Sequence, residues 1–158
     1  MGVSWTRRIG VAAACAAVAS APTAAAAPSG VCVGPAVSFD AHAESAIRAL
    51  ANRFRVSAGL RPLRARAALT RVARRHSLEM ARRGRFAHSL RNGRFPWAKG
   101  RPAGENLALA GTAREAHVML TLSPPHRATL LGGRYRSFGV GVLRTCTGQL
   151  LVTQDFLA

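Results

Sequence analysis

The spacing of apolar residues predicts two amphipathic helices in the first half of the chain. Within residues 40–58 and 66–83, apolar side chains recur at intervals of three and four, as on one face of a helix. The first set is Ile47, Leu50, Ala51, Phe54 and Ala58, and the second is Leu69, Val72, Ala73, His76 and Met80. Asp40 suits the N-cap of the first helix, and Gly59 and Gly84 suit the positions where the two helices stop.

The second half of the chain changes character from loop to helix to strand. Residues 89–103 are rich in Gly, Pro and Arg and indicate a surface loop. A short helix is expected over residues 112–122, and Ser123-Pro124-Pro125 can start another, with Ser as N-cap and Pro at the first helical position. The tail alternates apolar residues with glycines, which predicts two short strands joined by a turn near Gly148.

The first 26 residues have the three parts of a secretory signal peptide. Arg7 and Arg8 precede an apolar stretch, and small alanine-rich sequence follows it. The alternative is a helix that stays in the membrane as an anchor. We predict cleavage, which leaves an arm over residues 27–39, a domain over 40–158, no transmembrane segment, and a secreted protein.

Cleavage would also remove one of the three cysteines. Cys15 lies in the signal, so Cys32 and Cys146 remain as an even pair in a chain bound for an oxidising compartment. We therefore predict a disulfide between Cys32 and Cys146.

The charge of the chain is concentrated in one part of it. The formal net charge is +17, and residues 48–101 hold 16 basic residues and one acid. Arg71, Arg74, Arg75 and Arg82 cluster opposite the apolar face of the second helix, and such a basic face should adhere to anionic polymers. The plainer interpretation is that arginine is simply the usual solvated residue of this chain. No motif for sequence-specific binding of nucleic acid is present.

Few side chains in the chain could carry chemistry. His88, Glu105 and His126 are each expected at the end of a helix or strand, where side chains can point into a shared cleft. Two imidazoles and a carboxylate suit a divalent ion with an open position. His76 lies on an apolar face instead, and we expect a core histidine bonded to backbone.

Five segments, taken in order, resemble the bacterial SCP-like branch of the CAP superfamily, which includes cysteine-rich secretory, antigen 5 and pathogenesis-related class-1 proteins. They are NRFRVSAGLRPL (52–63), LTRVARRHSLEMARRGRFAHS (69–89), GENLA (104–108), SPPHRATLL (123–131) and FGVGVLRTCTGQLLVTQDF (138–156). The resemblance implies an α+β fold, a three-layer α-β-α sandwich with the helices first and a small antiparallel sheet completed by the C-terminal hairpin.

The resemblance also implies a cleft lined by two histidines and two glutamates that can hold a divalent metal. His88, Glu105 and His126 match three of these four, whereas the second glutamate has no clear counterpart, since Glu115 lies two turns before Ser123. Ser89, Asn106 and Ser123 are candidates for orienting the three. We therefore expect no required cofactor and at most a weakly bound ion such as zinc.

Two functions from different classes fit these observations. The first is a secreted, non-enzymatic binding module at the cell envelope or outside the cell, expected as a monomer, with a lipid, a sterol or an anionic envelope polymer as its partner. The second is a metal-assisted peptidase or esterase in the same cleft. The missing glutamate favours the first, because one carboxylate would otherwise serve as both ligand and base.

Overall fold

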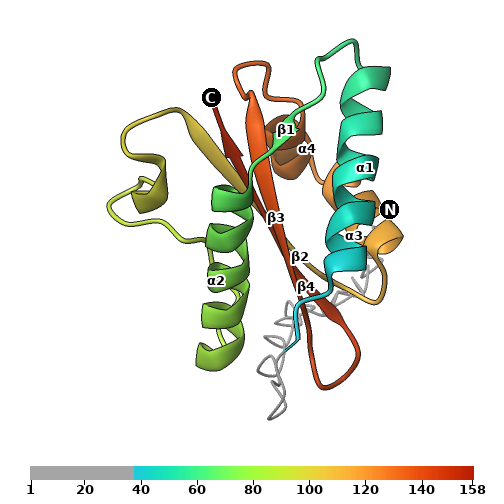
Figure 1. The fold of residues 1–158 in the computed structure, drawn as a ribbon, viewed down its shortest axis with the longest axis vertical. Helices are drawn as coiled ribbons and strands as arrows, with labels where there is room; N and C mark the ends of the chain where they lie inside the picture. The colour runs from blue at the N-terminus through green and yellow to red at the C-terminus, as the bar shows by residue number, and fades with distance from the viewer. Residues whose placement is uncertain (1–37) are drawn as a thin grey trace, which may run out of the picture.

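The computed structural model describes residues 38–158, which form three layers around a four-stranded sheet (Figure 1). The helices are α1 (Ala41–Ser57), α2 (Ala67–Arg83), α3 (Ala113–Leu122) and α4 (Pro124–Leu130), with a 3₁₀ turn η1 (Pro96–Ala98). The strands are β1 (Arg64–Ala65), β2 (Ala103–Ala110), β3 (Ser137–Arg144) and β4 (Leu150–Leu157). α2 covers one face of the sheet, and α1, α3 and α4 cover the other.

The sheet confirms the predicted α+β class, with one difference in strand direction. The strand order is β1-β3-β4-β2, and β4 pairs antiparallel with both of its neighbours. β1 pairs parallel with β3, so the sheet is mixed rather than purely antiparallel. The two residues of β1 are too few to show a strand period, and their pairing with β3 is set by where α1 and α2 pack.

The main helices and the hairpin lie where the sequence predicts them. Asp40 caps α1 by accepting a hydrogen bond from the Ala43 amide at 2.8 Å. Gly84 ends α2 in the left-handed conformation, and Gly148 has a positive φ in the turn between β3 and β4. The predicted loop is shorter than expected, because η1 and the start of β2 fall within residues 89–103.

The buried face of α1 differs from the predicted one. Ala58 is exposed, whereas Glu44 and Arg55 are almost fully buried. Arg55 donates to the carbonyl of Leu130, the last residue of α4, at 2.6 Å and to that of Gly132 just beyond it at 3.2 Å. These hydrogen bonds satisfy the buried guanidinium, and burial lowers the pKa of Arg55.

α2 lies directly on the backbone of β3. A Cβ placed on Gly139 or Gly141 would come within 2.2 or 2.3 Å of backbone atoms of α2. Only glycine allows this close approach of helix and strand. The larger apolar core therefore forms on the other face of the sheet, where Phe138, Val140 and Val142 of β3 contact α1 and its neighbours.

Two predictions fall on the N-terminal segment. The predicted signal peptide and Cys32 lie outside the described residues, so cleavage and the Cys32–Cys146 disulfide stay predictions. At the end of the predicted arm, Phe39 forms a β-bridge with Leu143. Among residues 38–158, no helix is both long and apolar enough to cross a membrane.

Candidate functional site

Glu105 is the centre of a hydrogen-bonded cluster at the edge of the sheet. It is the third residue of β2, and its carboxylate is buried on the α2 side. One oxygen accepts the Ser89 amide at 2.9 Å and lies 2.9 Å from Nδ1 of His88. The other accepts the Ser89 hydroxyl at 2.6 Å. Both oxygens of Glu105 are therefore engaged by the segment that follows α2.

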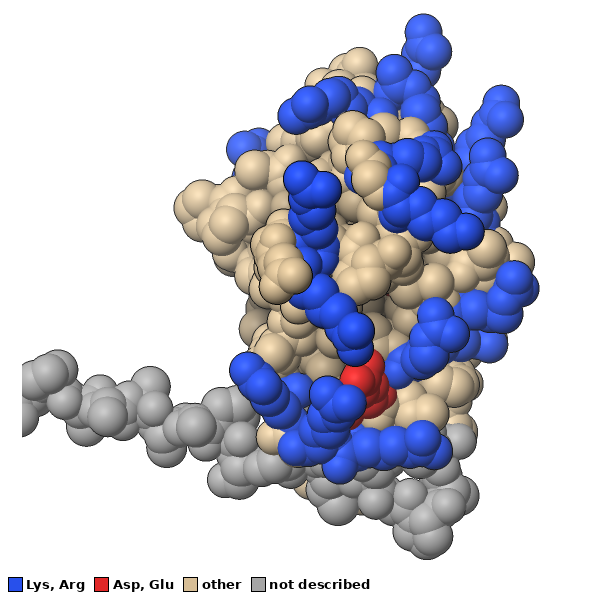
Figure 2. Space-filling view, turned by 90° about the vertical axis from the view of Figure 1, so that its left-hand side faces the viewer, with Lys and Arg blue, Asp and Glu red and all other residues tan. Residues whose placement is uncertain are grey.

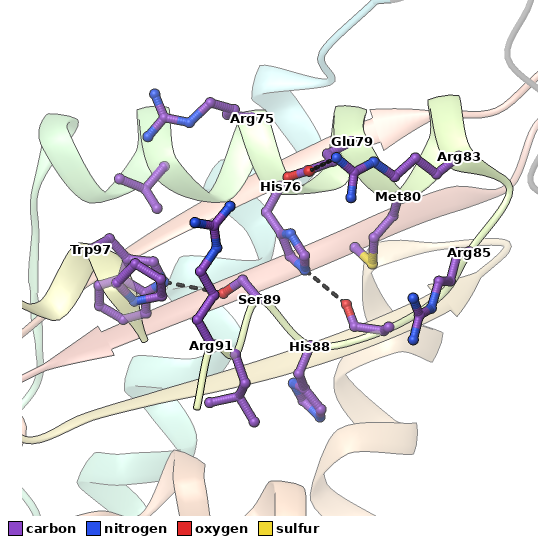
Figure 3. Close-up of a pocket in the computed structure, with 14 residues that line it drawn as sticks. Arg75, His76, Glu79, Met80, Arg83, Arg85, His88, Ser89, Arg91 and Trp97 are labelled. Atoms are coloured by element: carbon purple, nitrogen blue, oxygen red, sulfur yellow. Dashed lines mark hydrogen bonds and ion pairs between the residues drawn. The ribbon is translucent and has the colours of Figure 1, made fainter. Parts of the chain in front are cut away.

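Two further hydrogen bonds fix this segment, residues 84–97: one joins it to α2, and the other lies within it. Nε2 of His76 lies 2.9 Å from the Ala87 carbonyl, so this ring nitrogen carries the proton and donates it. The indole N–H of Trp97 donates to the Ser89 hydroxyl at 3.2 Å. Figure 3 shows both bonds. His76 is thus a core histidine bonded to backbone, as the sequence predicts.

A second buried carboxyl group lies beside Glu105. Asp155 of β4 is the register partner of Glu105, and its side chain is fully buried. Burial and the neighbouring charge of Glu105 raise the pKa of Asp155 well above that of an ordinary aspartate. The pair therefore favours a neutral Asp155 next to an ionised Glu105.

His126 stands apart from this cluster, although it is near His88. It lies in the first turn of α4, where its Nδ1 is 2.8 Å from the Ser123 hydroxyl. Asn106 of β2 donates to the backbone carbonyl of His126 at 3.1 Å. Partial burial lowers the pKa of His126, and the charge of His88 lowers it further.

The structure therefore brings His88 and Glu105 into contact and leaves His126 bonded elsewhere. Ser89 orients Glu105, Ser123 orients His126, and Asn106 holds the backbone of α4. In residues 38–158, no three His, Cys, Asp or Glu side chains are grouped so that they could hold a metal ion. The Glu105 oxygens contact Ser89 and Nδ1 of His88, and His126 contacts Ser123, so the three predicted ligands do not converge on one point.

Local structure also explains why Glu115 does not act as the second glutamate of the cleft. Glu115 lies in the first turn of α3, where its carboxylate accepts the Gly111 amide at 2.9 Å. Its own amide donates to the Thr112 hydroxyl at 3.1 Å. Together these bonds form a helix cap related to the capping box, so Glu115 serves the helix and not the cleft.

A pocket that no sequence pattern indicated lies between α2 and residues 84–97 (Figure 3). Its volume is about 600 Å³. The residues that carry polar chemistry in its wall are Arg75, His76, Glu79, Arg83, Arg85, His88, Ser89, Arg91 and Trp97. The signal that could have found it is the alternation of arginines with Phe86, Leu90 and Trp97 directly after α2, a segment that the sequence predicts only as a helix end and a loop.

Seven exposed arginines lie on the α2 side of the molecule, on α2 and the segment after it (Figure 2). We call this the arginine-rich face; it comprises Arg71, Arg75, Arg82, Arg83, Arg85, Arg91 and Arg94. Arg74 differs from the prediction, because its guanidinium forms a two-point ion pair with the buried Glu44, at 2.7 Å for each contact. Arg74 therefore joins α2 to α1 and adds little free charge to the face.

Comparison with solved structures finds the same fold in other bacterial proteins. An outer surface protein from Borrelia burgdorferi is similar with a TM-score of 0.67 and 17% identity, over 77% of this chain and 98% of that one. An extracellular SCP-domain protein from Bacillus anthracis is similar with a TM-score of 0.64 and 27% identity, over 73% of this chain and 40% of that one. A cysteine-rich secretory protein from Staphylococcus aureus gives 0.60 and 19%, over 73% and 38%.

Sequence comparison agrees with the fold. Among curated proteins, no relative matches this chain. The family model for CAP, the cysteine-rich secretory protein family, matches residues 48–156, which is more than half of the chain. That span includes α2, the pocket, Glu105, His126 and the C-terminal hairpin. The chain therefore belongs to the CAP family of cysteine-rich secretory proteins.

Proposed function

We propose that this protein is a secreted, non-enzymatic binding module that adheres to an anionic polymer of the cell envelope through its arginine-rich face. The similar proteins from Borrelia and Bacillus are an outer surface and an extracellular protein, which supports a location outside the cytoplasm. The predicted signal peptide supports the same location.

The observation that carries this proposal is the concentration of positive charge on one face of the molecule. The seven arginines of the face lie on α2 and the segment after it, and Glu79 is the one acid between residues 48 and 101. Arginine matches phosphate and carboxylate groups through its planar set of donors. A polymer that repeats an anionic group could contact several of these side chains at once.

An anionic polymer fits this surface better than a lipid bilayer or a sterol. The exposed large apolar residues of the described chain are divided among α1, α3 and the segment after α2. Only Phe86 and Leu90 accompany the arginines. This leaves a charged surface without a broad apolar patch that could enter a membrane.

The hydrolase alternative gains no specific support from the site. A metal-assisted reaction would need Glu105, His88 and His126 to converge with a general base. Glu105 is instead buried and bonded to Ser89 and His88, and His126 is bonded to Ser123. The hydrogen bonds of Glu105 with Ser89 and His88 hold the pocket wall in place and do not position a reacting group.

Binding to purified envelope polymer at increasing salt tests the proposal. We expect affinity to fall steeply with salt, and an Arg71→Gln, Arg82→Gln variant to bind several-fold more weakly at low salt. An Arg53→Gln, Arg114→Gln variant removes the same charge from α1 and α3 and should bind like the parent. Equal losses in both variants, or stronger binding to sterol or neutral lipid vesicles than to polymer, would contradict the proposal.

A further inference from the structure

The pocket between α2 and residues 84–97 has walls that are fixed before any ligand arrives. Residues 84–97 are bonded to the sheet through Glu105, and to α2 through His76. The opposite wall is α2, which lies on the glycines of β3. A preformed pocket loses less entropy on binding than a mobile one.

Three arginines give this pocket an unpaired positive charge. Arg83 is already paired with Glu79 at 2.8 Å. Arg75, Arg85 and Arg91 line the same pocket, and within residues 38–158 no carboxylate lies within ion-pair distance of them. Figure 3 shows Arg91 extending from the segment after α2 toward the helix that carries Arg75. An anion in the pocket would therefore meet guanidinium groups from both walls.

Trp97 provides a different kind of surface in the same pocket. Its N–H is used by the Ser89 hydroxyl, and Phe95 packs against its ring with the centroids 5.3 Å apart. The N–H edge of the indole is thus held in place, and the face of the ring is the part of Trp97 that a ligand can contact. Aromatic faces are electron-rich, and they pack well against the polarised C–H groups of sugar and polyol chains.

We infer that this pocket binds a phosphate ester of a sugar or polyol, with the phosphate against Arg75 and Arg91 and the carbon skeleton against Trp97, at the end of the pocket where Figure 3 shows these three side chains. A volume of about 600 Å³ fits a small organic molecule rather than a bare ion. The inference rests on the proposed function, since it names the anionic unit of the envelope polymer that the arginine-rich face would hold.

Tryptophan fluorescence gives a direct test. The chain contains two tryptophans, Trp5 and Trp97, so in a Trp5→Phe background Trp97 is the sole reporter. We expect glucose 1-phosphate to change the emission saturably and to bind about tenfold or more tightly than inorganic phosphate, with glucose alone showing no saturation. A poly(glycerol phosphate) titration distinguishes a polymer-borne ester from a free one. Absence of saturable binding by both phosphate esters would overturn the inference.

Matched arginine variants separate this site from general charge attraction. Arg91→Gln should weaken glucose 1-phosphate binding about tenfold or more, whereas Arg71→Gln, on the same face but outside the pocket, should change it less than about twofold. Equal losses in the two variants would overturn the pocket site. If that happens while polymer binding keeps its dependence on the arginine-rich face, the proposed function stands without the pocket.

Discussion

Glu105 and Asp155 are directly opposite each other on β2 and β4, with both carboxyl groups buried. The Asp155 oxygens accept no hydrogen bond within the described chain. A second negative charge at this point would be both desolvated and repelled, so a proton is held there at pH values where an exposed aspartate has lost it. The stability of the domain should therefore depend on the protonation of Asp155.

Asp155→Asn should stabilise the protein at neutral pH by about 1–3 kcal/mol. An aspartate in the unfolded chain has a pKa of about 3.8, and folding raises the pKa of Asp155 above that value. Between these two values the native state binds the extra proton, so the free energy of unfolding falls as pH rises through that window. Urea unfolding at pH values from mildly acidic to neutral measures this fall in the free energy of unfolding. The Asp155→Asn variant should not show the fall.

Asp40→Asn is the control of opposite sign. The Ala43 amide and Arg144 lower the pKa of Asp40, so its contribution is present above the unfolded pKa and is lost as pH falls. This variant should be less stable than the parent at neutral pH and should approach it in acid. If the two variants shift stability in the same direction at neutral pH, the assignment of the proton to Asp155 is wrong.

Gly141→Ala should destabilise the domain strongly. The added Cβ would meet the Arg74 backbone nitrogen at 2.3 Å, and backbone cannot move aside as a flexible side chain can. Overpacking typically costs about 1–3 kcal/mol, and this contact should lie at or above the top of that range. Thermal unfolding beside Gly133→Ala, whose Cβ would meet nothing within 4 Å, provides the comparison. Equal melting temperatures would refute the packing argument.

Ser89→Ala should loosen the pocket wall. The substitution removes the hydroxyl that donates to Glu105 and accepts from the Trp97 indole. We expect a loss of about 1–3 kcal/mol, because a buried carboxylate oxygen loses its partner. Trp97 emission should also move to longer wavelength as its N–H becomes solvated. Ser57→Ala, which removes an exposed hydrogen bond to Phe54, should leave stability and emission nearly unchanged.

Glu44→Gln should cost far more stability than Glu79→Gln. Glu44 is buried and binds Arg74 at two points, and it also accepts the Val142 amide of β3. Hydrogen bonds to a charged group are worth about 1.5–3 kcal/mol. The Glu79–Arg83 pair is exposed on α2 and should contribute less than about 1 kcal/mol. Denaturant titration compares them, and similar losses would count against the difference in burial as the cause.

Much of the fold follows from the periodicity of the sequence. The intervals of three and four placed α1 and α2 to within a residue or two, and the capping residue Asp40 acts as expected. The burial of Arg55 and Glu44 escaped that reasoning, because a polar residue is buried only when distant groups satisfy it. Those groups, the carbonyls at the end of α4 and the guanidinium of Arg74, are known only once the helices have packed.

The sequence identified only part of the site, again because contacts between distant segments are known only once the chain has folded. Family resemblance selected Glu105, and the structure shows what its carboxylate contacts. Asp155 is one of three consecutive polar residues in β4, and only the pairing of β2 with β4 sets it against Glu105. Trp97 and Arg91 fell in a segment without periodicity, so no pattern assigned them to a wall shared with α2.

The neighbouring residues Glu105 and Asn106 fix how β2 joins the sheet. β2 lies at the sheet edge and is apolar from Leu107 to Ala110, so hydrophobicity alone barely distinguishes its two faces. Slippage by one residue would turn the carboxylate toward α4 and the amide toward Ser89, and both anchors would be lost together. Two adjacent polar side chains thus exclude an alternative alignment that the apolar residues of this strand would otherwise tolerate.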